Sequence, residues 1–407
     1  MNPPSNTTQV RFLDASTPPH VATLVALSSI AALAMNVFLP SLPSMTVYFD
    51  TEYAVMQLSV SLYLAVNAVL QLFVGAISDR LGRRPVMIGA LVIFILATIG
   101  TLFATSATVF LMFRMMQATV VSGIVLSRAS IRDVMGEAEA ASRIGYVTMG
   151  MALVPMIAPA IGGVLDEFFG WRGSFGLMLI AGVAVLILAL RDMGETKHDR
   201  GGSMRAVFGE LPELMRARRF WGYCTTAMLA SGAFFAYLGG APFVGSEVLG
   251  LSPSMLGLYF GAPALGYAAG NFLSGRYAAR VGINRMILVG CIVGFGGMAL
   301  LLGIALSTQL TALIFFGCFV FTGVGNGMLL PSATSGMMSV RPHLAGTASG
   351  LGGAILIGGG AGLSALAGAL LTPQSGAMPL IWLLFATTGL AFLPLLYVIR
   401  REREISG

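Results

Sequence analysis

The side chains that could do chemistry in this chain lie mostly at the edges of long apolar stretches. The densest group is the run G-A-I-S-D-R-L-G-R-R from Gly75 to Arg84, which holds one carboxylate and three guanidiniums. Charges packed in this way are costly to place in lipid, so the run marks the cytoplasmic edge of a hydrophobic span. Its one acid, Asp79, would lie where a helix end exposes carbonyl groups, and its carboxylate therefore needs a cationic partner.

A second chemical feature is an arginine inside an apolar stretch. Arg114 lies about six residues, or roughly 9 Å, into the expected helix 109–131. An arginine at that depth needs water or a partner, which makes it a candidate for function. Gln117 lies one turn further on and shares its face. The alternative is an arginine whose stem lies in lipid while its head reaches the outer headgroups.

The apolar stretches lack the residues that hydrolysis or metal binding would require. Away from the ends of these stretches the sequence has no Asp, Glu, Lys or His. The three cysteines fall inside apolar stretches, where they act as small apolar side chains. The histidines lie at edges or in loops: His20, His198 and His343. We therefore expect no enzyme, no cofactor and no metal site.

Composition indicates a membrane protein. Of the 407 residues, 56% are hydrophobic and only 10% are charged, and a soluble chain of this size could not bury so much apolar surface. A helix that crosses a bilayer needs about 20 apolar residues. The stretches that meet this length are residues 21–43, 54–77, 86–105, 109–131, 144–165, 171–190, 221–243, 253–274, 286–307, 310–332, 347–371 and 378–399. The expected fold class is an all-α integral membrane protein with twelve transmembrane helices.

The positions of Lys and Arg predict the orientation in the membrane. If the N-terminus is cytoplasmic, nearly all basic residues lie in inner links, and the outer links hold essentially only Arg172. We therefore expect both termini in the cytoplasm. The net charge of +6 then reflects membrane topology, so no nucleic-acid partner is expected.

The chain divides once, where hydrophobicity stops between Arg191 and Arg219. This division predicts an N-terminal six-helix bundle over residues 1–190, a cytoplasmic linker over 191–219 and a C-terminal six-helix bundle over 220–407. The halves also repeat one another at the cytoplasmic end of their second spans, two hundred positions apart. The repeated residues are Gly75, Arg80 and Gly82, which recur as Gly275, Arg280 and Gly282. The repeat favours paired bundles with a substrate site at their interface.

Several motifs resemble those of the major facilitator superfamily. The run from Gly75 to Arg84 resembles the superfamily's loop between helices two and three. The stretch R-M-M-Q-A from Arg114 to Ala118 is similar to the fourth-helix motif of its proton-linked drug exporters. P-A-I-G-G from Pro159 to Gly163 resembles the end of the fifth-helix antiporter motif. Three shorter phrases resemble the Bcr/CflA group of drug exporters: F-L-P-S-L-P (Phe38 to Pro43), G-W-R-G-S-F (Gly170 to Phe175) and A-P-F-V (Ala241 to Val244). The resemblance covers nearly the whole chain and implies an alternating-access transporter of the bacterial inner membrane.

The resemblance also implies gating roles. Asp79 is expected to pair with Arg128 or Arg132 and to face the start of helix eleven near Thr347, which would latch the halves while the cytoplasmic side is closed. The alternative is a static anchor that only sets orientation. The other residues of the gating motifs are Gly75, Arg80, Gly82, Arg83, Arg84, Pro159, Gly162 and Gly163.

Proline and glycine in helix five predict a bend near its outer end, because Pro159 removes a backbone hydrogen bond. The sequence departs from the family's motif, since Val154 and Ala158 stand where glycines are usual. A packing role for Gly162 and Gly163 is therefore the alternative to a gating role.

The main departure from the resemblance is in helix one. Bcr/CflA proteins usually carry an aspartate at the position of Asn36, and an amide does not titrate at physiological pH. Three explanations stay open. The cargo could move without protons, by facilitation or exchange, or Arg114 could recruit an anionic substrate. Protons could instead act through acids at the outer rim: Asp50, Glu52, Asp166 and Glu247.

The substrate pocket is expected where the halves face each other. Its polar and apolar side chains would suit amphipathic, drug-sized molecules. The expected lining is Asn36, Tyr63, Asn67, Arg114, Gln117, Met149, Phe235 and Tyr237. The expected partners of this monomer are a small-molecule substrate, membrane lipids and protons as the candidate coupling ion. The predicted function is export of drugs or metabolites, with proton antiport favoured over a proton-independent facilitator or exchanger.

Overall fold

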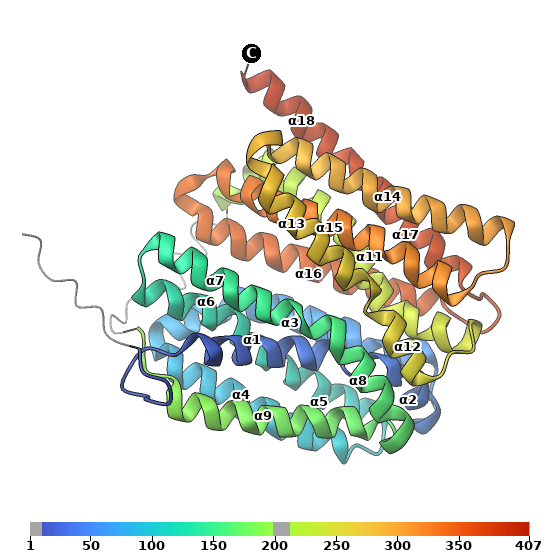
Figure 1. Cartoon of the computed structure of the whole chain (residues 1–407), viewed down its shortest axis with the longest axis horizontal. Coiled ribbons are helices and arrows are strands. Elements are labelled where there is room, and N and C mark those ends of the chain that lie inside the picture. The colour runs from blue at the N-terminus through green and yellow to red at the C-terminus, as the bar shows by residue number, and fades with distance from the viewer. Residues whose placement is uncertain (1–9, 198–211, 407) are drawn as a thin grey trace, which may run out of the picture.

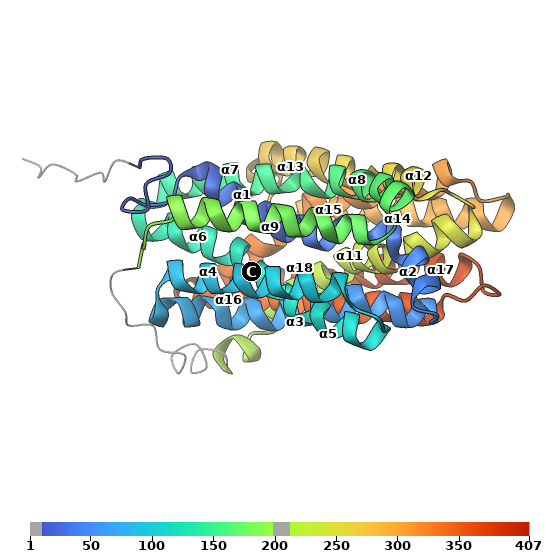
Figure 2. The ribbon, with the colours of Figure 1, turned by 90° about the horizontal axis from the view of Figure 1, so that it is seen from below.

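The helices of the chain run along one common axis. The structure is a computed structural model that describes residues 10–197 and 212–406, and these residues form helices and connecting turns without a strand. The helices of the first half (blue to green) lie together on one side, and those of the second half (yellow to red) lie on the other (Figure 1). Figure 2 shows the same lengthwise arrangement from below.

The first half holds six helical segments, three of which are divided by a short 3₁₀ helix or a single residue. Their parts are α1 (Val21–Asn36), η1 (Leu39–Ser41), α2 (Leu42–Tyr48), α3 (Tyr53–Leu81), α4 (Arg83–Leu102), α5 (Ala107–Gln117), η2 (Ala118–Val121), α6 (Ser122–Val134), α7 (Glu137–Ala152), α8 (Val154–Phe169) and α9 (Arg172–Asp192).

The second half follows the same plan. Its parts are α11 (Arg218–Phe243), the π-helix η3 (Val244–Val248), α12 (Pro253–Phe260), α13 (Ala262–Val281), α14 (Ile283–Ser307), α15 (Ala312–Val340), η4 (Pro342–Leu344), α16 (Ala345–Leu370), α17 (Met378–Leu390) and α18 (Phe392–Ser406).

Eleven segments of the described chain are long and apolar enough to cross a membrane. The expected span 253–274 is formed by α12 and α13, which are separated at Gly261. The helical ladder is interrupted there because Pro263 has no N–H and the Ala264 N–H bonds to the Gly261 carbonyl instead. With this divided helix the twelve predicted spans are accounted for, and the predicted all-α membrane fold is confirmed.

The turn after the second span has the same geometry in both halves. Gly82 ends α3 with φ +101°, and Gly282 ends α13 with φ +91°. Each N–H donates over 2.9 Å to the carbonyl four residues earlier, at Ser78 and Ala278. Backbone of this kind favours glycine. The matched turns support the internal repeat that the sequence predicts.

Both described ends of the chain lie toward one end of the bundle, which we call the termini end; the opposite end is the far end (Figure 1). The end of α9 and the start of α11 also lie at the termini end. Much of the expected linker 191–219 falls on residues 198–211, outside the described residues. Within its described part, Leu214 is fully buried in a cluster with Phe220 of α11. The domain boundaries at 190 and 219 stay predictions.

Candidate functional site

Arg114 lies inside the first half, enclosed by its own bundle. It is in the last turn of α5, and only 1% of its surface is exposed. The guanidinium carbon lies 4.2 Å from the ring centroids of both Phe38 and Tyr63, so two aromatic faces stabilise the cation. The alternative in which Arg114 reaches the outer headgroups is therefore wrong.

Three hydrogen bonds hold the same guanidinium. Its Nε donates to the Ser59 carbonyl (3.2 Å), and its terminal nitrogens donate to the Ala34 carbonyl and to Gln117 Oε1 (2.8 Å each). Gln117 Nε2 in turn donates to Thr98 Oγ1 over 2.9 Å. Arg114 and Gln117 thus share one face, as the spacing predicts, and they join α5 to α1, α3 and α4.

The end of α1 explains how the positive charge is tolerated. Because α1 ends at Asn36, the carbonyl of Ala34 belongs to a last turn that lacks helical partners. A cation at a helix C-terminus is stabilised by the helix dipole. No ion pair among the described residues includes Arg114. Helix-end carbonyls and aromatic rings therefore balance the charge, and the enclosed guanidinium cannot meet an anionic substrate in this conformation.

Asn36 and Asn67 use their side chains within their own helices. Asn36 is buried, and its Nδ2 donates to the Ala32 carbonyl over 2.8 Å. Asn67 Oδ1 accepts a bond of 2.8 Å from Gln71 Nε2, one turn further along α3. Of the expected pocket residues, Tyr63 and Gln117 are in direct contact with Arg114. Phe38 also contacts Arg114, and we call these four residues the Arg114 cluster.

The expected site residues of α7 and α11 have other surroundings. Tyr237 is fully buried, and its hydroxyl donates over 3.1 Å to the Phe260 carbonyl, just before the break between α12 and α13. Phe235 packs so closely on α16 that a side chain on Gly360 would overlap its ring. Met149 is 63% exposed. A single pocket that gathers all eight expected residues stays a prediction.

The charge cluster at the termini end differs from the expected latch. Asp79 Oδ1 pairs with Arg83 Nη2 at 2.6 Å, and not with Arg128 or Arg132. Arg83 Nε also binds Asp133 Oδ2 at 2.9 Å, from the last turn of α6. The expected pairing is therefore wrong for this conformation, because the tight turn from α3 to α4 brings Arg83 back onto the last turn of α3. Asp133 was missed because its closeness to Arg83 depends on tertiary packing.

Glu195 completes this cluster from just beyond α9. Its carboxylate accepts bonds from the backbone N–H groups of Arg83 (2.8 Å) and Arg84 (3.2 Å), the first two residues of α4. Free N–H groups at a helix start attract an anion. A side chain on Gly82 would overlap this carboxylate. The gating-motif residues of this turn thus bind one another within the first half.

Arg83→Gln is expected to lower the free energy of unfolding by about 2 to 3 kcal/mol, because Asp79 and Asp133 lose their cation. This figure is below that for a fully buried pair, since the Asp79 side chain is 31% exposed. Thermal unfolding of the purified protein in detergent, followed by tryptophan fluorescence, would measure it. Arg80→Gln is the matched control, because Arg80 is exposed; equal stability of the two variants would contradict the assignment.

The two halves touch backbone to backbone where α8 crosses α12, a contact that we call the far-end seam. A side chain on Gly163 would overlap the carbonyl of Pro253, and one on Gly257 would overlap the carbonyl of Pro159. Small residues permit this close approach of helices. Gly163 and Pro159 of the fifth-helix motif therefore contribute to a contact between the halves.

Gly162, next to Gly163, serves a different contact. A side chain there would overlap the carbonyl of Val37, inside the first half. The fifth span is interrupted at Leu153, between α7 and α8, while Pro159 is inside the α8 helix, and the bend expected near Pro159 stays a prediction. The cause of the interruption is Pro155, whose ring and missing N–H favour a helix start.

Two buried polar side chains cross between the halves at a second contact, where α3 meets α11 and α16. The Tyr53 hydroxyl donates to the Gly239 carbonyl over 2.7 Å. Gln57 Nε2 donates to the carbonyl and the hydroxyl of Ser364, over 2.7 and 2.8 Å. Neither residue was expected at a site, although their spacing of one turn in an apolar span was a usable signal.

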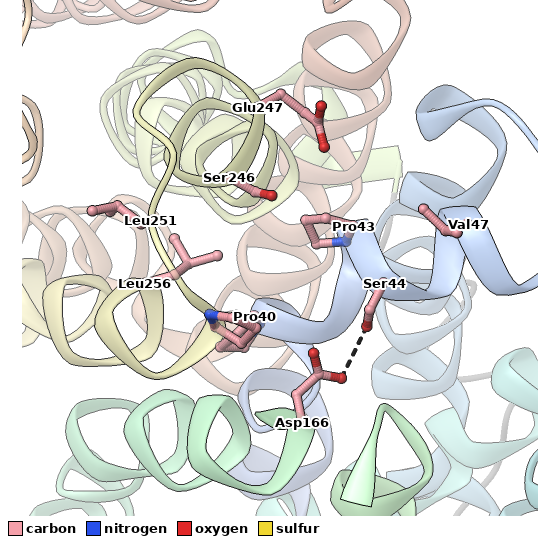
Figure 3. A pocket seen from close by; sticks show the side chains of 10 residues that line it. Pro40, Pro43, Ser44, Val47, Asp166, Ser246, Glu247, Leu251 and Leu256 are labelled. Atoms are coloured by element: carbon pink, nitrogen blue, oxygen red, sulfur yellow. Dashed lines mark hydrogen bonds between the residues drawn. The ribbon is translucent and has the colours of Figure 1, made fainter. Parts of the chain in front are cut away.

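A cavity of about 250 Å³ lies between the halves beside the seam (Figure 3). Its wall is largely proline, valine and leucine. The polar residues that line it are Ser44 and Asp166 from the first half and Ser246 and Glu247 from the second.

Comparison with known proteins decides the family. Residues 24–361 match the family described as Major Facilitator Superfamily. The chain belongs to the major facilitator superfamily. It is therefore a multi-pass membrane transporter and not an enzyme, as the sequence predicts.

Curated relatives of this transporter include drug-resistance proteins of bacteria. It is 30% identical to Multidrug resistance protein D of Escherichia coli over 385 residues, covering 89% of this chain and 95% of the relative. It is 28% identical to a chloramphenicol resistance protein of Pseudomonas aeruginosa, covering 82% of each chain. A bicyclomycin resistance protein homolog of Haemophilus influenzae is 23% identical over 95% of this chain and 98% of the relative. The resemblance to Bcr/CflA-type exporters is confirmed.

Solved structures of other transporters share the fold. The structure titled D-xylose-proton symporter aligns with a TM-score of 0.74 at 16% identity, over 93% of this chain and 96% of that one. A bacterial homolog of the human lysosomal transporter Spinster, in an inward-facing and unoccupied conformation, aligns with a TM-score of 0.70 at 17% identity, over 94% and 96%. At these identities the likeness concerns the fold alone.

Proposed function

We propose that this transporter exports small amphipathic molecules by alternating access. The observation that carries the proposal is the far-end seam, where glycine-lined backbones of the two halves touch without a covalent link. Such a contact can open as the bundles rock, giving access from one end at a time. The relatives named for multidrug, chloramphenicol and bicyclomycin resistance support drugs or similar metabolites as the cargo.

We assign the far end to the outside of the cell and both termini to the cytoplasm of a bacterium, in the inner membrane. The distribution of basic residues supports this orientation, since the links at the far end carry essentially only Arg172. The Asp79 cluster would then change partners toward the start of α16 when the cytoplasmic side closes. The protein would act as a monomer.

We take proton antiport as the driving force, in line with the likeness of the fourth-helix motif R-M-M-Q-A to that of proton-linked exporters. The second candidate is a proton-independent facilitator or exchanger. Asn36 favours this candidate, because its amide carries no titratable proton at a position where the resemblance to the Bcr/CflA group implies an aspartate.

Transport by purified protein in proteoliposomes distinguishes the two candidates. Ethidium and chloramphenicol serve as cationic and neutral probes, and a pH-sensitive dye in the lumen reports proton movement. Under antiport, an imposed pH gradient should raise probe accumulation several-fold, and probe movement should shift the lumenal pH. Asn36→Asp should strengthen this dependence, because it restores a titratable group. Probe flux that ignores the gradient in the native chain would select the facilitator.

A further inference from the structure

A carboxylate is buried in the contact between the halves. Asp166 lies in the last turn of α8, next to the far-end seam, and only 7% of its surface is exposed. It lines the cavity of Figure 3, and its Oδ1 accepts a hydrogen bond of 2.9 Å from the Ser44 hydroxyl of α2. The opposite wall comes from the second half, so parting of the halves would expose Asp166 to water.

The charged groups around Asp166 do not neutralise it. Glu247 of η3 stands on the opposite cavity wall and is exposed. Glu167 lies beside Asp166 in the chain and accepts a bond of 2.9 Å from Ser254 across the seam. Among the described residues, no ion pair includes Asp166. The acids at this site therefore repel one another when ionised.

The basic residue nearest in the chain is engaged elsewhere. Arg172, at the start of α9, donates to the Tyr48 hydroxyl (2.6 Å) and to the Leu102 carbonyl (3.1 Å). The other elements packed on α8 bring only a tyrosine, Tyr259 of α12, to this end, while α1 and η1 have no charged residue. The charged residues of α7 and α13 lie at the termini end of those helices.

Closing the seam is therefore costly for an ionised Asp166. A buried carboxylate without a cation loses hydration that nearby serine hydroxyls do not replace, and the helix C-terminus adds carbonyl groups of the same sign. A protonated carboxyl avoids both costs and can still bond to Ser44. Opening the seam restores water around the group and removes the penalty on ionisation.

We propose that Asp166 is a proton-operated lock of the far-end seam: a proton on its carboxylate favours the closed seam, and loss of that proton favours opening. By linkage, lower pH at the far end shifts the halves toward the closed state. The proton is bound from and released to the same side, so the lock involves no net proton transport. It rests on the alternating access proposed above, but not on proton antiport.

The experiment measures the seam directly, without cargo. Spin labels attached to Val47→Cys and Val248→Cys report the distance between the halves at the far end, because both positions are exposed and come from different halves. The three native cysteines are replaced by alanine in this background. In detergent, the ratio of open to closed seam is expected to rise about tenfold from pH 3 to pH 8, the effect of a one-unit pKa difference between the two states for a carboxyl group that titrates near pH 4 in water.

Asp166→Asn is the deciding variant, because its amide keeps the shape and the bond to Ser44 but carries no proton to lose. Its open-to-closed ratio should change less than about twofold across the same range, with the seam closed throughout. Asp166→Ser, a second neutral variant, should behave alike. Glu247→Gln is the matched control from the same cavity and should keep the pH dependence.

Each result tests whether Asp166 controls the far-end seam. A pH-dependent seam in Asp166→Asn, or a seam in the parent protein that opens equally at both pH values, would overturn it. If Glu247→Gln lost the pH dependence and Asp166→Asn kept it, the effect would belong to Glu247 and the proposal for Asp166 would be overturned. A seam that never opens under any condition would instead refute the alternating access on which the lock rests.

Discussion

Arg114→Ala is expected to abolish transport of every probe and to lower the free energy of unfolding by about 3 kcal/mol or more. The substitution removes a fully enclosed side chain from between Phe38 and Tyr63, leaves the Ala34 carbonyl without a donor and removes the second donor of the Ser59 carbonyl. Because these groups come from α1, α3 and α5, the loss would loosen the junction of three spans. Thermal unfolding in detergent and probe flux in proteoliposomes measure the two effects.

Two further variants separate the roles of the guanidinium. Arg114→Lys keeps the charge, but an ammonium group is not planar and cannot stack between two rings or donate to several acceptors in the same geometry. This variant should therefore recover only a small part of the stability. Tyr63→Phe keeps the ring and should behave like the native protein. If Arg114→Ala were as stable as the native protein but inactive, the side chain would act on cargo and not on the fold. Full activity in Arg114→Ala would dismiss both roles.

The spans of this fold could be predicted because lipid imposes a simple rule on sequence. A segment must be apolar over about 20 residues to cross, so hydropathy alone located the helices. The repeat was also readable, since the turns at Gly82 and Gly282 adopt backbone that glycine favours. Even the eighth span was predicted, although its hydropathy is lower than that of the other spans and Gly261 divides it.

The partners of individual side chains could not be predicted in the same way. The sequence showed that Asp79 needs a cation and that Arg114 needs a partner, but several candidates satisfied each need. The choice of Arg83 follows from how tightly α3 turns into α4, and the enclosure of Arg114 follows from where α1 ends. Tyr237 shows the same limit, because its bond to Phe260 exists only where the break in the eighth span frees a carbonyl.

Adjacent glycines of the fifth helix should give opposite results when each is replaced by alanine. Gly163→Ala places a methyl group against the carbonyl of Pro253 in the other half, and rocking the bundles apart relieves this overlap. We therefore expect near-native thermal stability, a far-end seam that stays open, and a loss of transport of at least about tenfold.

Gly162→Ala places its methyl group against the carbonyl of Val37 within the same bundle, where no rocking motion can relieve it. This variant should lose about 1 to 3 kcal/mol of stability, as overpacked cores do. Gly176→Ala on α9, whose methyl group would meet open space, is the control and should change neither stability nor transport. Since helix propensity changes identically in all three variants, the difference between them isolates the contact that each glycine permits. Equal stability loss in Gly162→Ala and Gly163→Ala would show that the seam is a fixed part of the fold. The two halves would then have to separate at a different contact.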